Sequence, residues 1–332
     1  MLASTLLAAT LASPVATIQE PARWYADLEK ARTVAAAEGK HVLVDFTGTG
    51  WCAWCKRLDD EVLSKPRFVE RAAESFVLVR LDFDVRGRAR RDLPRAEQND
   101  GFREAAGVTA FPTVLLLTAE GVPYARQGYR EGGAMPYADW VRSEHDRAVA
   151  LQRAVPDVVA GVARAKSAEE ARGAADAATR VLRDAGAHAL ARPLVPIVRT
   201  VLGEDELSTE RERAAVAALV FAEAVDDDVL ERAFLLDPRN REGLPEAALL
   251  AAIRRAGNAE RARVLVDRAE GLLRTTEVFD RKRAARLYGD CAVWCKNSLG
   301  APDRARALAR FALSLKPEDR ELRDVLESLS GG

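Results

Sequence analysis

The sequence predicts an α/β domain with a mixed central sheet, followed by a region built almost wholly of helices. Two observations support this. Over residues 21–150, short apolar runs alternate with helical segments in the order β, α, β, α, β, β, α, which is typical of a mixed sheet with helices on both faces. Beyond residue 150 the chain is rich in Ala, Leu and Arg, and Gly, Pro, Asp or Asn divide it into helix-length pieces.

Length and composition limit the possible functions. The chain of 332 residues has room for two domains. Its formal net charge is -1, with 30% charged residues of both signs, so nothing in its bulk charge indicates nucleic-acid binding. Four cysteines are too few for a disulfide-built scaffold. The sequence has no nucleotide or flavin fingerprint, so we expect no cofactor and electrons supplied by another protein or a small thiol.

Residues 1–20 are similar to a secretory leader. The stretch from Met1 to Ala16 is apolar and uncharged, with Ala12 and Ala16 as candidate cleavage points, which predicts export. A leader normally begins with a basic residue, whereas the first one here is Arg23, so a cytoplasmic chain is the alternative. No apolar run is long enough for a membrane span, so we expect no membrane contact beyond this leader.

The first region opens with a predicted amphipathic helix at residues 21–38 that ends at Gly39. Its apolar face consists of Trp24, Leu28, Ala31 and Ala35. A buried strand is predicted from Val42 to Phe46. A helix follows the Gly/Thr turn after that strand, and Pro66 suits the first turn of the next one.

Three more strands and two more helices complete this region. They are a strand at 76–83, a short helix at 102–106, a strand at 108–117, a short strand at 124–128 and a closing helix at 135–150. An arginine-rich segment at 86–95 separates the first strand of this set from the short helix. We interpret it as a solvated loop, with docking of an acidic partner as the alternative.

The chemistry is predicted at Cys52 and Cys55, at the start of the helix that follows the buried strand. Residues i and i+3 share one helix face, so the two sulfurs can form a disulfide without backbone movement. Unpaired first-turn amides and the helix dipole favour the thiolate of the outer cysteine. We therefore predict a redox couple in which Cys52 is the nucleophile and Cys55 resolves.

Two other interpretations of this pair are weaker. A zinc site needs four ligands, but Cys291 and Cys295 are far along the chain and the three histidines are scattered singly. A structural disulfide that closes so small a loop removes little chain entropy and stabilises the fold little. Redox chemistry without a metal is the prediction.

Three features in this order and spacing resemble the thioredoxin superfamily over residues 21–150. They are Val44-Asp45-Phe46, Trp51-Cys52-Ala53-Trp54-Cys55-Lys56 and Phe111-Pro112-Thr113. The branch resembled often occurs in exported bacterial proteins, and the leader-like N-terminus predicts export to the periplasm. It also implies a mixed sheet with helices on both faces.

The resemblance further implies roles for individual residues. Phe111–Pro112 should be a cis peptide opposite the dithiol, where Phe111 offers its backbone to an extended substrate. Asp45 resembles the buried acid that helps to deprotonate the resolving Cys55. The turn at residues 48–50 is one residue longer than in thioredoxin proper, a departure that bears on the position of Asp45.

The residues between the cysteines also depart from thioredoxin, which has Gly-Pro where this chain has Ala53-Trp54. Such residues help to set the reduction potential. We expect Trp51 and Trp54 to contribute to substrate binding, with Trp54 offering an aromatic surface beside the reactive thiol. The alternative is that Trp54 only packs against Trp51.

The second region predicts an array of helices joined by short turns, as in an α-solenoid. Helices are expected at 157–185, 190–202, 208–225, 227–236, 245–256, 259–273, 277–298, 301–315 and 318–329. The segment containing Ala305, Ala312 and Pro317 resembles the second helix of a tetratricopeptide repeat, and Ala233 with Pro238 repeats this pattern weakly. The two prolines are 79 residues apart, which is not a multiple of the usual period of about 34.

Cys291 and Cys295 are predicted to be buried small hydrophobes. Residues i and i+4 on a helix keep their Cβ atoms about 5–6 Å apart, whereas a disulfide needs about 3.5–4.5 Å. The two cysteines also belong to an apolar stripe at helical spacing. The stripe consists of Leu287, Cys291, Trp294, Cys295 and Leu299.

Together these features predict a leader at 1–20, a thioredoxin-like domain at 21–150 and a helical domain at 151–332. The predicted function is a thiol–disulfide oxidoreductase that acts on protein thiols and disulfides, with helices that dock an unidentified redox partner protein. The alternative is a non-catalytic interaction protein whose first domain is a scaffold for the helices. Delivery of reductant to a metallochaperone or a cytochrome-maturation partner is a further possibility.

Overall fold

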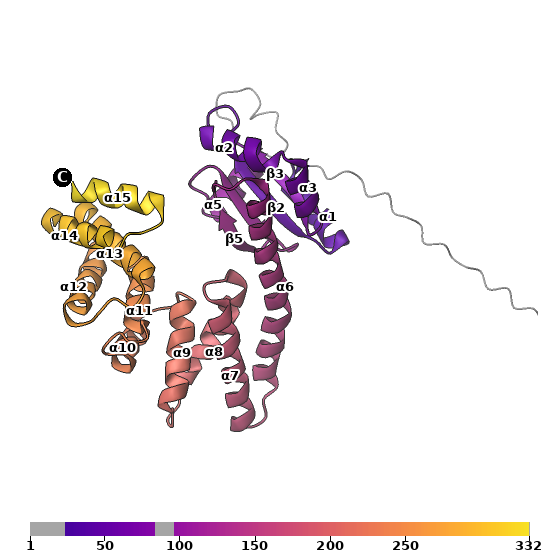
Figure 1. Cartoon of the computed structure of the whole chain (residues 1–332). Helices are drawn as coiled ribbons and strands as arrows, with labels where there is room; N and C mark the ends of the chain where they lie inside the picture. Colours follow the sequence, from indigo (N-terminus) through magenta and orange to yellow (C-terminus); the bar gives the residue numbers. More distant parts are fainter. Residues whose placement is uncertain (1–23, 84–95, 332) are drawn as a thin grey trace, which may run out of the picture. The chain divides into compact units, whose positions relative to one another are not determined.

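A computed structural model describes residues 24–83 and 96–331. The leader predicted at 1–20 and the arginine-rich segment at 86–95 lie outside these residues. The chain divides into two compact units, residues 1–142 and 143–332. Within the described residues, Figure 1 shows strands only in the first unit, and helices α7 to α15 in the second.

The N-terminal unit contains one five-stranded sheet with the order β1-β3-β2-β4-β5. Its strands are β1 (Trp24–Tyr25), β2 (His41–Thr47), β3 (Phe76–Asp82), β4 (Thr113–Leu117) and β5 (Pro123–Gln127). Strands β1, β3 and β2 run parallel, whereas β4 pairs antiparallel with both β2 and β5. The mixed sheet predicted from the sequence is confirmed.

Among the described residues, five helices and one π-helical segment accompany this sheet. They are α1 (Leu28–Glu38), α2 (Ala53–Leu58), the π-helical η1 (Asp59–Leu63), α3 (Pro66–Ala73), α5 (Ala96–Ala105) and α6 (Ala134–Arg164). Pro66 begins α3, as predicted, because its missing N–H has no partner in a first helical turn. Helix α6 starts in the N-terminal unit and ends in the C-terminal one.

Helix α1 is shorter than the predicted helix at 21–38. Asp27 caps it, because its extended backbone starts the helix and its side chain accepts a hydrogen bond from the Lys30 amide. Trp24 therefore belongs to a short strand that pairs with β3, not to the helix face on which it was predicted. The helix ends as predicted at Gly39, which has a φ of 63°.

The two faces of the sheet are covered by different helices, as predicted. Val42, Val44 and Phe46 of β2 pack in one core cluster with the buried residues of α1. Alternation along the strand turns Asp45 to the opposite face. Asp59 of η1 contacts Arg80, the β3 residue directly paired with Asp45, so the dithiol helix and its continuation cover that second face.

Three other predicted boundaries differ from the structure. Strand β4 begins at Thr113 instead of residue 108, because Pro112 has no N–H to donate to a strand ladder. Helix α5 begins at Ala96 instead of 102. Helix α6 continues to Arg164, and the predicted helix at 157–185 is therefore divided between α6 and α7.

The C-terminal unit is helical, as predicted. Its helices after α6 are α7 (Ala168–Ala185), the 3-10 segment η2 (Ala189–Leu194), α8 (Val195–Val201), α9 (Thr209–Phe221), α10 (Asp227–Leu236), α11 (Leu244–Ile253), α12 (Ala259–Thr275), α13 (Arg281–Asn297), α14 (Pro302–Ser314) and α15 (Arg320–Ser330). Among the described residues, no helix combines the length and the hydrophobicity that a membrane crossing requires.

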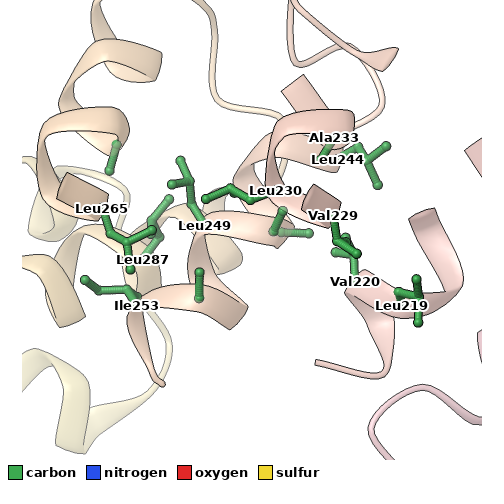
Figure 2. Packing of buried hydrophobic residues seen from close by; sticks show 14 of the residues in the cluster. Leu219, Val220, Val229, Leu230, Ala233, Leu244, Leu249, Ile253, Leu265 and Leu287 are labelled. Carbon is green, nitrogen blue, oxygen red and sulfur yellow. The ribbon is translucent and has the colours of Figure 1, made fainter. Parts of the chain in front are cut away.

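The helices of this unit pack as two layers. From α7 to α15 each helix contacts the next one along the chain, and the odd-numbered helices α7, α9, α11, α13 and α15 also contact one another in succession. One apolar core runs between the layers, and Figure 2 shows its central part, where Leu230, Leu249 and Leu287 come from three different helices. Nearest-neighbour packing of this kind is typical of helical solenoids.

Cys291 and Cys295 belong to this core and are fully buried, as predicted. Both are free thiols on α13. Burial raises the pKa of each thiol above its ordinary value, because the anion would lose its hydration. They fill space in the core as small apolar side chains.

Candidate active site

The turn between β2 and α2 holds the dithiol motif in place. The backbone amide of Cys52 donates to the Gly48 carbonyl at 2.9 Å. The Thr49 amide donates to Asp82 Oδ1 at 3.1 Å, and the Thr49 hydroxyl donates to the other oxygen of the same carboxylate at 2.5 Å. The turn at residues 48–50 is thus anchored to the end of β3.

Cys52 and Cys55 form a disulfide, with Cα atoms 5.2 Å apart. Cys52 is the N-cap of α2, and its Sγ accepts a hydrogen bond from the Cys55 amide at 3.1 Å. Cys52 is 8% exposed and Cys55 only 2%. Cys52 is thus the more exposed of the two cysteines, and the same amide would stabilise its thiolate after reduction.

The predicted cis peptide at Phe111–Pro112 is confirmed. The indole of Trp51 packs edge-on against the Phe111 ring, with centroids 5.4 Å apart, and its N–H donates to the Phe83 carbonyl at 3.1 Å. Trp51 remains 40% exposed. Trp51 thus brings the dithiol motif into contact with the segment before β4.

Asp45 lies in the middle of β2 and is buried. Burial raises the pKa of its carboxyl to about 7, against the opposing effect of the nearby Arg80 guanidinium. Arg80 Nε is 3.4 Å from Asp45 Oδ2, but Oδ1 has no hydrogen-bond partner among the described residues. A carboxyl with such a pKa can exchange a proton near neutrality.

Arg80 was not identified from the sequence. Its guanidinium lies between the carboxylates of Asp45 and Asp59 and 4.7 Å from the centre of the Trp24 ring. A signal was present, because Arg80 and Asp45 are opposite charges within two largely apolar strands. Single-sequence reasoning did not supply the register that pairs them directly.

Trp54 is 55% exposed and packs on Tyr129, with ring centroids 5.3 Å apart. Glu61 ties the surrounding residues together, because its carboxylate accepts from Arg57 Nε at 2.7 Å and from the Tyr129 hydroxyl at 2.6 Å. These bonds lower the pKa of Glu61 and raise that of Arg57. Sequence reasoning found Trp54 but not its three partners.

Comparison with known proteins agrees with this geometry. Residues 23–119 match a family model described as thioredoxin-like. The disulfide bond reductase DsbH of Chlamydia pneumoniae is 30% identical over 104 residues, which are 31% of this chain and 61% of that protein. The thioredoxin-related protein DsbJ of the same organism is 28% identical over 109 residues, 33% of this chain and 30% of that protein.

The matched region therefore spans less than two thirds of either relative. Among solved structures, a DsbH oxidoreductase aligns with a TM-score of 0.35 and 25% identity over 43% of this chain and 95% of that one. The reduced C-terminal domain of Neisseria meningitidis DsbD aligns with a TM-score of 0.28 and 20% identity over 36% of this chain and 98% of that one.

Proposed function

We propose that the thioredoxin-like domain of this chain reduces disulfides in other proteins through the Cys52–Cys55 couple. The observation that carries this proposal is the disulfide at the N-cap of α2, with its outer sulfur reachable and an amide directed at it. The relative named a disulfide bond reductase supports the reducing direction.

The proposed reaction is a pair of thiol–disulfide exchanges. In the reduced protein the Cys52 thiolate attacks one sulfur of the partner disulfide, and the other partner sulfur leaves as a thiolate. The Cys55 thiolate then attacks Cys52 Sγ and releases the partner's second thiolate. The partner gains two electrons and becomes a dithiol, while Cys52 and Cys55 become a disulfide that a second dithiol protein or a small thiol must reduce.

Asp45 is proposed to take the proton of Cys55 before the second exchange. It occupies the sheet face that α2 and η1 cover, and its pKa of about 7 matches a proton acceptor at neutral pH. Trp51, Trp54, Phe111 and Pro112 are proposed to bind the substrate chain. The C-terminal unit is proposed to dock the redox partner, since solenoids offer extended binding surfaces.

We also propose that the protein works in an exported, disulfide-permissive compartment such as the periplasm. The uncharged stretch from Met1 to Ala16 supports this location. Cell fractionation with antibodies to the native protein tests it, and recovery of the whole pool with cytoplasmic enzymes would contradict it.

Insulin reduction with dithiothreitol as electron donor tests the proposed activity. We expect turnover by the native protein and a loss of at least about 1,000-fold in Cys52→Ser, because the nucleophile is gone. Cys55→Ser should instead accumulate a mixed disulfide through Cys52, visible by mass spectrometry of the unreduced complex. Equal turnover by the native protein and both variants would end the proposal.

A further inference from the structure

We propose that Arg57, Glu61 and Tyr129 are positioning residues that hold Trp54 as an apolar contact surface. This surface selects polypeptide disulfides in which a bulky apolar residue adjoins the half-cystine attacked by Cys52. The inference rests on the proposed function and adds a substrate class to it.

The positioning network joins three separate segments. Trp54 and Arg57 belong to α2, Glu61 to η1, and Tyr129 follows β5. The two oxygens of Glu61 each accept one bond, from Arg57 Nε at 2.7 Å and from the Tyr129 hydroxyl at 2.6 Å. Because one carboxylate holds both groups, the phenol ring and the guanidinium are fixed relative to the dithiol helix.

The fixed groups meet the indole from one side. Tyr129 lies 5.3 Å from Trp54 between ring centroids, and Arg57 Cζ lies 5.5 Å from the Trp54 ring and 4.9 Å from the Tyr129 ring. Trp54 nevertheless keeps more than half of its surface exposed. A large aromatic side chain that is already ordered loses little conformational entropy when it contacts a ligand.

The position of Trp54 determines what it contacts. It lies between the two cysteines that form the disulfide, two residues after Cys52. Neighbouring Cα atoms are about 3.8 Å apart, so a residue next to the substrate half-cystine can bring its side chain to the indole. An exposed indole gains most from burying apolar or aromatic surface, so this neighbour should be bulky and apolar.

Two matched peptide disulfides test the selection. They have equal length and charge and differ only in whether Phe or Gly adjoins the half-cystine, and bis(2-hydroxyethyl) disulfide serves as a substrate without side chains. We expect the native protein to favour the Phe peptide by about 10-fold in kcat/KM, in the range that one apolar contact supplies.

Three variants assign the preference to the network. Trp54→Ala should bring the ratio of the two peptides close to one. Tyr129→Phe keeps the ring but loses the bond to Glu61, and it should lower the ratio by about 2–5-fold, mainly through KM. Val122→Ala is the matched control. Val122 is 45% exposed and lies beyond the end of β4, whereas Pro112 precedes the start of that strand. The ratio of the two peptides in this variant should therefore equal that of the native protein.

Bis(2-hydroxyethyl) disulfide separates the possible failures. The inference is overturned if the native protein shows equal kcat/KM for the two peptides, or if Trp54→Ala keeps the native preference. In either case, reduction of the small disulfide by the native protein leaves the proposed function standing. Failure of the native protein to reduce any of the three substrates overturns both.

Discussion

The two cysteine pairs of this chain differ less in spacing than in their position on a helix. Cys52 caps α2 at its first turn, next to an amide and reachable from outside. Cys291 and Cys295 lie inside α13 and are fully buried. The reactivity that we propose for the dithiol follows from where its helix begins, whereas the enclosed pair contributes packing.

A buried carboxylate in each unit shows a similar contrast between a structural position and one suited to chemistry. Glu246, at the start of α11, accepts hydrogen bonds from the backbone amides of Phe279 and Asp280 at 3.2 and 3.3 Å. Asp45 lacks a hydrogen-bond partner for Oδ1 among the described residues and has a pKa of about 7. Glu246 thus ties the start of α11 to the segment before α13, whereas Asp45 has the unpaired oxygen and the pKa that the proposed proton exchange requires.

Alkylation should show the largest difference between the cysteine pairs. In the reduced native protein at pH 7, we expect Cys52 to react with iodoacetamide about 10-fold faster than free cysteine, because its thiolate is stabilised. Cys291 should react at least about 100-fold more slowly than free cysteine, because burial keeps it protonated and unreachable.

Peptide mapping by mass spectrometry at timed intervals measures both rates. Denaturant serves as the control, since in the unfolded chain the cysteines should react at similar rates. Native labelling of Cys291 at the rate of Cys52 would contradict the contrast between the two pairs.

Asp45 should make stability depend on pH. Its pKa is about 7 in the folded protein and near 3.8 when exposed, so the folded state binds more protons between these values. The free energy of unfolding should therefore fall as pH rises from about 4 to about 7, by on the order of 4 kcal/mol from this group. Asp45→Asn should remove that slope in urea titrations.

The matched control for this prediction is Asp59→Asn. Asp59 contacts the same Arg80 guanidinium, and its charge raises the pKa of Asp45 less than burial does, so the variant should retain most of the slope. If the native protein and Asp45→Asn had the same pH profile, the carboxyl of Asp45 would not be held protonated by burial.

Cys291→Ser should test the packing role of the second pair. A buried hydroxyl without a partner costs about 1–3 kcal/mol, and the loss should appear as a lower urea midpoint. Turnover of insulin at low temperature should equal that of the native protein. A drop in activity greater than the change in stability explains would assign a redox role to α13 and weaken the contrast.

The sequence predicted the mixed sheet and the helical region well because their signals are local. Apolar runs located β2 and β3, and Gly39 and Pro66 located helix ends. The start of α1 was missed because Asp27 offers a cap inside a stretch that also has a helical pattern. Tertiary pairing of Trp24 with β3 then determined the structure of the preceding residues.

Spacing in the helical unit was harder to predict. The odd-numbered helices begin at residues 168, 209, 244, 281 and 320, so no constant period exists for a pattern search to detect. In the site, Cys52, Cys55 and Pro112 were found because they belong to a motif. Arg80 and Tyr129 were missed because their roles come from contacts between segments far apart in the sequence.

Gly48→Ala should give the smallest effect and tests how the motif turn supports reactivity. A Cβ at residue 48 would lie 2.5 Å from Cε2 of the Trp51 indole, so the ring must shift and strain its bond to the Phe83 carbonyl. We expect a loss of about 1 kcal/mol in stability and a few-fold loss in peptide reduction. Gly101→Ala is the matched control, because a Cβ there meets nothing within 4 Å on α5 and should stabilise the helix slightly. Equal activity in the two variants would show that Trp51 needs no fixed position for exchange at Cys52.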